Sequence, residues 1–268
     1  MTASPFDIAA YLERIRCPRP AGPGLEALAA LQQAHLTEIP FENLDILLGR
    51  PIRLDLEGLQ AKLVGGCRGG YCFEQNTLFR AALEALGFEV VSLAARVRAS
   101  LARPGGGVPQ VRPRTHMLLL VELPEGRFLA DVGFGGDGPV RPLLLADGTA
   151  SELGGLRHRL RREADEWVLE ADLGDLYAFT LEPLYPVDFV MANHFTSTWP
   201  DSPFVSGLTA QRSWVDRRVI LRNRELVLQS AAGERRLPVR DPDHLLAVLD
   251  EHFGLVFPAG TRFSRPEF

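Results

Sequence analysis

The sequence contains almost no lysine, few cysteines and no basic tract. Lysine occurs once in 268 residues, at Lys62, and arginine supplies every other basic side chain apart from histidine. The formal net charge of −5 gives the chain no electrostatic attraction for nucleic acid or for anionic membranes. The three cysteines are few, and odd in number, so they do not form a disulfide framework. We therefore expect no nucleic-acid partner.

Long hydrophobic runs are also missing. No stretch approaches the ~18 consecutive apolar residues that a membrane-spanning helix needs. The N-terminal segment MTASPFDIAAYLERIRC has neither the basic head nor the apolar run of a secretory signal peptide. These absences predict a cytoplasmic protein with no membrane partner, in a compartment that disfavours disulfides. With 46% apolar and 24% charged residues, the composition is that of an ordinary globular protein.

The residue pattern changes character twice along the chain. The first part is helical, with a helix start at Ser4, Pro5 and Asp7, a second helix at 25–36 and a third from about 71 to 86. The middle part has the pattern of strands, which we expect at 89–97, 116–123, 127–132, 158–162, 166–173 and 177–183. In the last third we expect a short helix at 187–194, strands at 214–222 and 225–230, and an amphipathic helix near 242–253.

This order predicts the α+β class. Helices come first, an antiparallel barrel or sheet follows, and a mixed α/β part ends the chain. We place the three parts at residues 1–88, 89–185 and 186–268.

The segment GGCRGGYCFEQN, residues 65–76, contains two of the three cysteines. Their spacing is not that of paired zinc ligands, and no second Cys or His pair accompanies them, so we expect no metal site. The glycines of this segment let the backbone approach closely before a helix begins. Cys72 then lies in the first helical turn, where free N–H groups and the helix dipole favour an anion such as a thiolate. A small buried cysteine on an ordinary helix fits the same pattern, so both interpretations remain open.

A thiolate nucleophile needs a base and a residue that orients the base. Four of the six histidines fit surface or core positions, and His194 is undecided; the four are His35, His158, His244 and His252. His116 opens the predicted strand 116–123, and Asp131 lies near the end of the next strand. The residues Leu123-Pro124-Glu125-Gly126 predict a type I turn between these strands. If that turn closes a hairpin, His116 and Asp131 are diagonal neighbours on one face, with Cα atoms about 7–8 Å apart.

Three segments resemble the active-site motifs of arylamine N-acetyltransferases: RGGYCFEQN (68–76), THMLLLV (115–121) and DVGFG (131–135). Two more segments, HLTEIPFENLDIL (35–47) and FTSTWPDSPFV (195–205), are similar to other parts of that family. The resemblance implies a helical bundle, a β-barrel and an α/β lid around a core like that of cysteine proteases. It also implies that Cys72 is the acetylated nucleophile, His116 the base and Asp131 the residue that orients it. Cys67 has no counterpart in this triad.

The resemblance further implies an acyltransferase of xenobiotic metabolism that uses acetyl-CoA as co-substrate and no metal. Aromatic amines and hydrazines would be acetylated through an acetyl-cysteine intermediate in ping-pong order. The acceptor pocket would be lined by Phe41, Thr115, Gly133 and Phe134, and CoA would lie in a cleft beside the lid, near Ser197 and Phe204. The segment LARPGGGVPQVRPR (101–114) departs from the family pattern and leaves the shape of the site mouth open. The oligomeric state also remains open.

Two other functions remain as alternatives. An amide synthase of a polyketide pathway has the same motifs, and papain-like or transglutaminase-like hydrolases have the same order of Cys, His and Asp. The resemblance also implies one structural contact, because it places the PFENL segment against the RGG loop. Glu42 lies in PFENL and Arg68 opens the RGG loop, both among apolar or glycine neighbours, where an unpaired charge would be costly. We predict that Glu42 and Arg68 form a partly buried ion pair.

Overall fold

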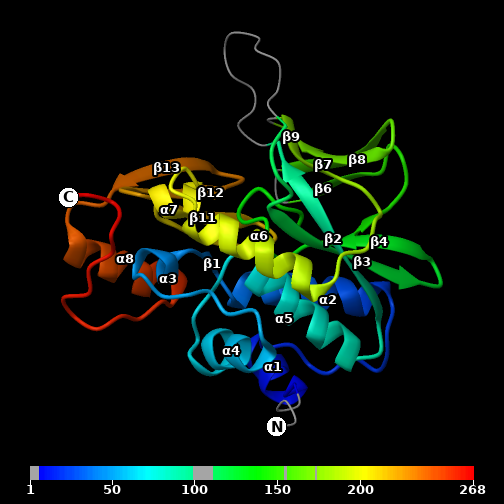
Figure 1. Cartoon of the computed structure of the whole chain (residues 1–268), viewed down its shortest axis with the longest axis horizontal. Coiled ribbons are helices and arrows are strands. Elements are labelled where there is room, and N and C mark those ends of the chain that lie inside the picture. The colour runs from blue at the N-terminus through cyan, green and yellow to red at the C-terminus, as the bar shows by residue number, and fades with distance from the viewer. Residues whose placement is uncertain (1–5, 99–110, 154–155, 173) are drawn as a thin grey trace.

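The computed structural model describes residues 6–98, 111–153, 156–172 and 174–268. In Figure 1 a strongly curved eight-stranded sheet lies on one side, a five-stranded sheet with its helix lies on the other, and the N-terminal helices lie below and between them. The long helix α6 (Pro186–Thr198) crosses between the two sheets (Figure 1). This arrangement confirms the predicted α+β class.

The N-terminal part is helical, as predicted. Its elements are α1 (Ile8–Arg14), α2 (Leu25–Glu38), α4 (Leu56–Leu59), the π-helical turn η1 (Gln60–Gly65) and α5 (Cys72–Ala85). Helix α1 begins after Asp7, whose carboxylate accepts the backbone N–H of Ala10 at 3.0 Å and so caps the first turn. Ser4 and Pro5, which were expected to start this helix, lie outside the described residues. Helix α5 ends just before Gly87, which has a positive φ of 87°.

The eight-stranded antiparallel sheet follows in sequence and forms a nearly closed barrel. Its strand order is β5-β4-β3-β2-β9-β8-β7-β6. The strands are β2 (Glu89–Val97), β3 (His116–Leu123), β4 (Gly126–Ala130), β5 (Leu143–Leu144), β6 (Ala150–Leu153), β7 (Leu156–Glu163), β8 (Glu166–Ala171) and β9 (Gly174–Phe179). In the hairpin of β3 and β4, Leu119 pairs with Ala130 and Leu123 pairs with Gly126. This is the predicted register, and it places Asp131 one residue past the end of β4.

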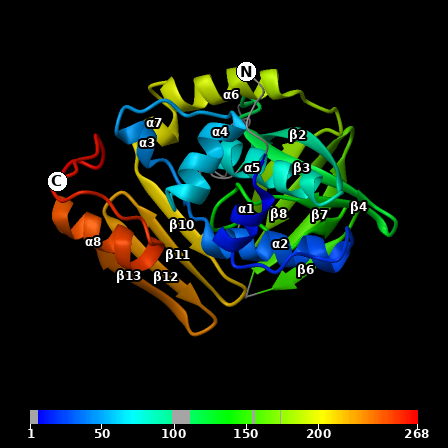
Figure 2. The same cartoon turned by 90° about the horizontal axis from the view of Figure 1, so that it is seen from below.

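The five-stranded sheet has the order β1-β10-β11-β12-β13. Its strands are β1 (Phe41–Glu42), β10 (Thr209–Ser213), β11 (Arg217–Arg222), β12 (Glu225–Ser230) and β13 (Gly233–Pro238). The other helices are α3 (Leu44–Leu47), α7 (Pro203–Ser206) and α8 (Pro242–Phe253), and α8 lies along this sheet in Figure 2. Strand β1 comes from the N-terminal part of the sequence, so this sheet joins distant segments of the chain.

Two predictions about the last third need correction. The strand expected at 214–222 begins only at Arg217, because residues 214–216 connect it to β10, a polar strand that no hydrophobic alternation marks. The helix expected at 187–194 is longer and spans Pro186–Thr198, with proline in its first turn. None of the helices in the described part of the chain combines the length and the apolar character that crossing a bilayer demands.

One hydrophobic cluster places the N-terminus of α5 where the three parts of the chain meet. It contains Cys72 together with Phe41 from β1, Met117 from β3 and Phe189 from α6. The first residue of α5 therefore belongs to a cluster to which both sheets and α6 contribute side chains.

Candidate active site

Cys72 is the first residue of α5 and is buried, with 3% of its surface exposed. Its Sγ lies 3.6 Å from the backbone carbonyl oxygen of Thr115, directly before His116 on the neighbouring strand. The first-turn N–H groups of a helix have no intrahelical partner, so the start of α5 offers donors and a partial positive charge beside this thiol. The structure therefore places Cys72 as the sequence predicts.

The two glycines before Cys72 are required by close backbone contact. A Cβ on Gly69 would lie 2.0 Å from the carbonyl oxygen of Pro40, and one on Gly70 would lie 2.7 Å from the Glu74 carboxylate. The Glu42 N–H also donates to the Gly70 carbonyl at 3.0 Å. The loop that carries the cysteine is thus fixed directly against the segment 40–42, with no space for side chains.

His116 and Asp131 are brought together as predicted. His116 Nε2 lies 2.7 Å from Asp131 Oδ2, and both side chains are almost fully buried. Because Nε2 contacts the carboxylate, the other ring nitrogen, Nδ1, is left for Cys72. Burial lowers the pKa of His116, but the Asp131 charge and hydrogen bonds to Asp131 and Cys72 outweigh it and raise that pKa to about 10. Asp131 therefore favours the imidazolium form of His116, the partner that a thiolate at Cys72 requires.

The Asp131 carboxylate accepts hydrogen bonds from four donors. Oδ2 accepts from His116 and from the Tyr177 hydroxyl at 3.0 Å, while Oδ1 accepts from Asn76 Nδ2 at 3.0 Å and from the Gly133 N–H at 2.8 Å. Burial raises the pKa of this carboxyl, but the His116 charge and the donated hydrogen bonds hold the pKa below its usual range. Asp131 therefore remains ionised and fixed in orientation.

The DVGFG segment places two further residues at the site. A Cβ on Gly133 would lie 2.7 Å from the Cys72 Cα and 2.6 Å from Asn76 Nδ2, so only glycine fits there. The Phe134 ring meets the His116 ring edge to face, with centroids 5.2 Å apart. Gly133 thus lies against the backbone of Cys72, and Phe134 lies beside the imidazole of His116.

The two other predicted aromatic residues form one cluster beside Cys72. The Phe204 ring lies 5.3 Å from the Tyr71 ring and 6.0 Å from the Phe41 ring, centroid to centroid. Ser197 lies on α6 and donates its hydroxyl to the backbone carbonyl of Asn193 at 2.8 Å. Asn193 in turn accepts a hydrogen bond from the Tyr71 hydroxyl. Helix α6 is thereby attached to the residue that precedes Cys72.

Glu42 and Arg68 form an ion pair. Arg68 Nη2 lies 2.8 Å from Glu42 Oε1 and 3.2 Å from Asp45 Oδ1, and the Glu42 side chain is fully buried. The second Glu42 oxygen accepts the Leu44 N–H at 2.6 Å. Arg68 also stacks on the Phe257 ring, and its buried Nε has no hydrogen-bond partner among the residues that the structure describes.

Sequence reasoning missed four polar residues of the site: Asn76, Tyr177, Lys62 and Glu74. Asn76 and Glu74 carry a signal, because the polar run Glu-Gln-Asn begins two residues after Cys72 and all three residues are buried on α5. No comparable local signal marks Tyr177, whose hydroxyl reaches Asp131 from β9, 46 residues away in sequence. In the part of the chain that the structure describes, no group of three or more His, Cys, Asp or Glu residues is arranged to hold a metal ion.

Comparison with known proteins gives consistent matches over most of the chain. A sequence profile described as N-acetyltransferase matches residues 24–261. The arylamine N-acetyltransferase of Escherichia coli (strain K12) is 40% identical over 253 residues, which cover 91% of this chain and 87% of that protein. The solved structure of arylamine N-acetyltransferase from M. tuberculosis has a TM-score of 0.87 at 39% identity, covering 92% of this chain and 93% of that one. The Mycobacterium marinum enzyme in complex with CoA has a TM-score of 0.86 at 38% identity, covering 92% of both chains.

The fold and these relatives define an acyltransferase. The chain belongs to the arylamine N-acetyltransferase family, so the activity to expect of it is acetyl transfer to arylamines. These relatives are acetyltransferases and not papain-like or transglutaminase-like hydrolases, so the comparisons do not support the hydrolase alternative.

The Glu42–Arg68 pair gives a prediction about stability. Glu42→Gln keeps an acceptor for the Leu44 N–H but leaves Arg68 with only Asp45 as a charged partner. Because removing one member of a buried pair leaves a charge uncompensated, we expect a loss of about 3 kcal/mol in the free energy of unfolding. Urea denaturation followed by circular dichroism measures it. Arg53→Gln, which breaks an exposed pair with Asp55, is the control and should cost under ~1 kcal/mol. Equal small losses in the two variants would contradict a buried pair.

Proposed function

We propose that the chain transfers the acetyl group of acetyl-CoA to arylamines, arylhydrazines and related aromatic amines through an acetyl-Cys72 intermediate. The observation that carries this proposal is the buried set of Cys72, His116 and Asp131 at the start of α5. The CoA complex of the M. marinum relative supports a CoA thioester as the donor. No metal takes part in the proposed chemistry.

In the first half-reaction, the Cys72 thiolate attacks the thioester carbonyl carbon of acetyl-CoA. The C–S bond to CoA then breaks, and the His116 imidazolium gives its proton to the departing CoA sulfur. Backbone N–H groups in the first turn of α5 stabilise the oxyanion that forms, an interaction worth about 3–4 kcal/mol in enzymes where one such donor was removed. The products are acetyl-Cys72, neutral His116 and free CoA.

In the second half-reaction, the amine nitrogen attacks the acetyl carbon of acetyl-Cys72. Neutral His116 takes the proton that the amine loses, and the Cys72 thiolate leaves, which restores the starting pair. Asp131 holds the imidazole through Nε2 during both steps and stabilises the imidazolium. Acid and base roles thus alternate on one histidine.

The acceptor ring requires a flat apolar surface near the thiol. Phe41 and Phe134 supply such surfaces, and Thr115 and Gly133 lie next to Cys72. Ser197 and Phe204 lie on the side of α6 and α7, where we propose that the CoA chain passes. These assignments depend on the motif resemblance and on the positions just described.

Mass spectrometry of the protein mixed with acetyl-CoA alone tests the covalent intermediate. We expect one acetyl group, on the peptide that contains Cys72, followed by its loss when an arylamine is added. Steady-state rates measured at several amine concentrations should give parallel double-reciprocal lines, because CoA leaves before the amine reacts. Intersecting lines would show direct transfer in a ternary complex, without the acetyl-cysteine. An adduct that forms but reacts with no free arylamine would favour the amide synthase alternative.

A further inference from the structure

Lys62, the single lysine of the chain, occupies a buried position between two carboxylates. Its side chain is 17% exposed, and Nζ lies 2.7 Å from Glu74 Oε1 and 2.8 Å from Asp45 Oδ2. The two carboxylates come from different helices, α5 and α3. A compact ammonium with three donors can contact both carboxylates at once.

Glu74 connects Lys62 to the backbone beside Cys72. Its side chain is 1% exposed, and while Oε1 contacts Lys62, Oε2 accepts the Tyr71 backbone N–H at 3.1 Å. Tyr71 is the residue before α5, and Glu74 is the third residue of that helix, so this contact caps the turn that begins with Cys72. One carboxylate therefore holds both the lysine and the start of the nucleophile helix.

The surroundings of Lys62 and Glu74 raise the pKa of both groups. Burial raises the pKa of Glu74 to about 7, and the Lys62 charge opposes that rise. Burial lowers the pKa of Lys62, but the carboxylates of Glu74, Glu42 and Asp45 outweigh it and hold that pKa above its ordinary value. Without the lysine, Glu74 would lose the partner that fixes its side chain and stabilises its charge.

We propose that Lys62 and Glu74 form a positioning pair for Cys72: Lys62 fixes the Glu74 carboxylate, and Glu74 fixes the first turn of α5 that presents the thiol. The inference rests on the proposed role of Cys72 as nucleophile. Because a displacement of about 1 Å can cost about 100-fold in rate, a loose cap weakens reactivity even where the fold survives. Neither residue contacts the reacting atoms in this account.

Alkylation of Cys72 by iodoacetamide at pH 7 tests the pair without any acetyl donor. The titratable and charged groups near the start of α5 are His116 and Asp131 from the barrel, Tyr71 directly before the helix, Glu74 in its first turn, and Lys62 from η1. We expect Lys62→Met to react at least about tenfold more slowly than the parent, at a temperature where circular dichroism shows both folded. Lys62→Arg keeps the charge and should recover most of the rate, to within about threefold of the parent.

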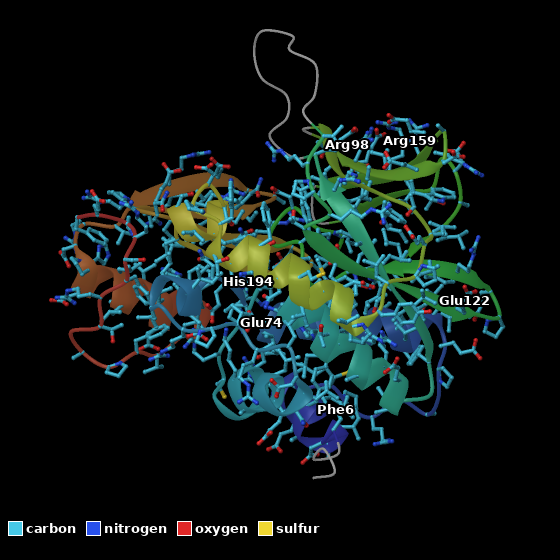
Figure 3. All side chains as sticks on the ribbon, viewed as in Figure 1. Phe6, Glu74, Arg98, Glu122, Arg159 and His194 are labelled. Carbon is cyan, nitrogen blue, oxygen red and sulfur yellow. The ribbon has the colours of Figure 1, made fainter. Side chains whose placement is uncertain are left out.

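The control removes a cation from a carboxylate cluster far from the thiol. Arg98 contacts Glu163, Glu166 and Asp175 on the barrel, and Figure 3 shows Arg98 at the upper edge of the barrel, whereas Glu74 lies near the centre of the molecule. Arg98→Met should lower the melting temperature without changing the alkylation rate. A Lys62→Met variant that melts lower but alkylates within about twofold of the parent would overturn the proposal, because the pair would then be only structural.

A second variant covers the case in which Lys62→Met does not fold. Glu74→Gln keeps an amide oxygen for the Tyr71 N–H but loses the charge that binds Lys62, and we expect alkylation at least about threefold slower. A parent-like rate for Glu74→Gln would overturn the proposal. If the variants alkylate slowly as expected but the parent forms no acetyl adduct, the positioning pair stands and the proposed function fails.

Discussion

Cys72→Ser is expected to abolish acetyl transfer, with a loss of at least about 10⁴-fold in kcat/KM for the arylamine. A serine hydroxyl stays protonated where a thiol ionises, so the ion pair with the His116 imidazolium cannot form. The variant should keep the fold, because serine is close to cysteine in size and the site already contains polar partners. Activity is measured by arylamine acetylation, and the fold by the melting temperature.

Cys67→Ser is the matched control for this experiment. Cys67 is exposed, has a positive φ of 50° and lies on the same loop, five residues before Cys72. Its Sγ donates to the Val64 carbonyl oxygen at 3.7 Å, within the same part of the chain. We expect Cys67→Ser to retain most of the activity. An equal loss in both variants would show that the two cysteines act together, as in a disulfide or a metal site.

For elements with strong local patterns, the sequence predicted the first and last residues correctly. Strands β2, β3 and β12 and helix α8 have the expected bounds, because alternation or helical periodicity continues through each of them. The hairpin register could also be predicted, since a turn of two residues leaves one way to align its strands. From that register follows the closeness of His116 and Asp131, the most informative part of the site.

Elements without such patterns could not be predicted. Strands β10 and β13 are short and polar, and β1 has two residues, so their pairing depends on neighbours rather than on their own sequence. The polar partners of the site are missed for a related reason. Tyr177 reaches Asp131 across the barrel, and Lys62 reaches Glu74 from a π-helical turn, contacts that exist only once the chain has folded.

Glycines in the motifs show an intermediate case. The sequence indicates that Gly69 and Gly70 allow close approach, and the resemblance implies that Gly133 lies at the acceptor pocket, but only the structure shows what each glycine approaches. Gly69 lies against Pro40, Gly70 lies against the Glu74 carboxylate, and Gly133 lies against the Cys72 backbone. The resemblance to family motifs supplied the roles, and the contacts now give those motifs a physical reason.

Asp131→Asn should reduce kcat/KM by about 10³–10⁴-fold, the size of effect known where an amide replaces the orienting carboxylate of a triad. The reason is specific to this site. Both oxygens of Asp131 accept two hydrogen bonds each, and all four partners are donors. An asparagine must turn its NH₂ group toward one of these two pairs of donors. Whichever way the amide lies, two of the four donors then face an NH₂ group instead of an acceptor oxygen. If the NH₂ group faces His116, Nε2 has to become the acceptor and Nδ1 carries the proton, which is the wrong tautomer for a base that faces Cys72.

Tyr177→Phe is the comparison variant for Asp131→Asn. It weakens the hydrogen-bond network around Asp131 without removing the carboxylate that orients His116. It removes one donor from the oxygen that binds His116 and leaves the carboxylate, its charge and the other three donors in place. We expect a loss of about 1 kcal/mol in stability and under about tenfold in rate. Rates of arylamine acetylation and urea denaturation of both variants give the comparison. If Asp131→Asn lost no more activity than Tyr177→Phe, the charge and tautomer control assigned to Asp131 would be wrong, and burial of His116 alone would have to account for its reactivity.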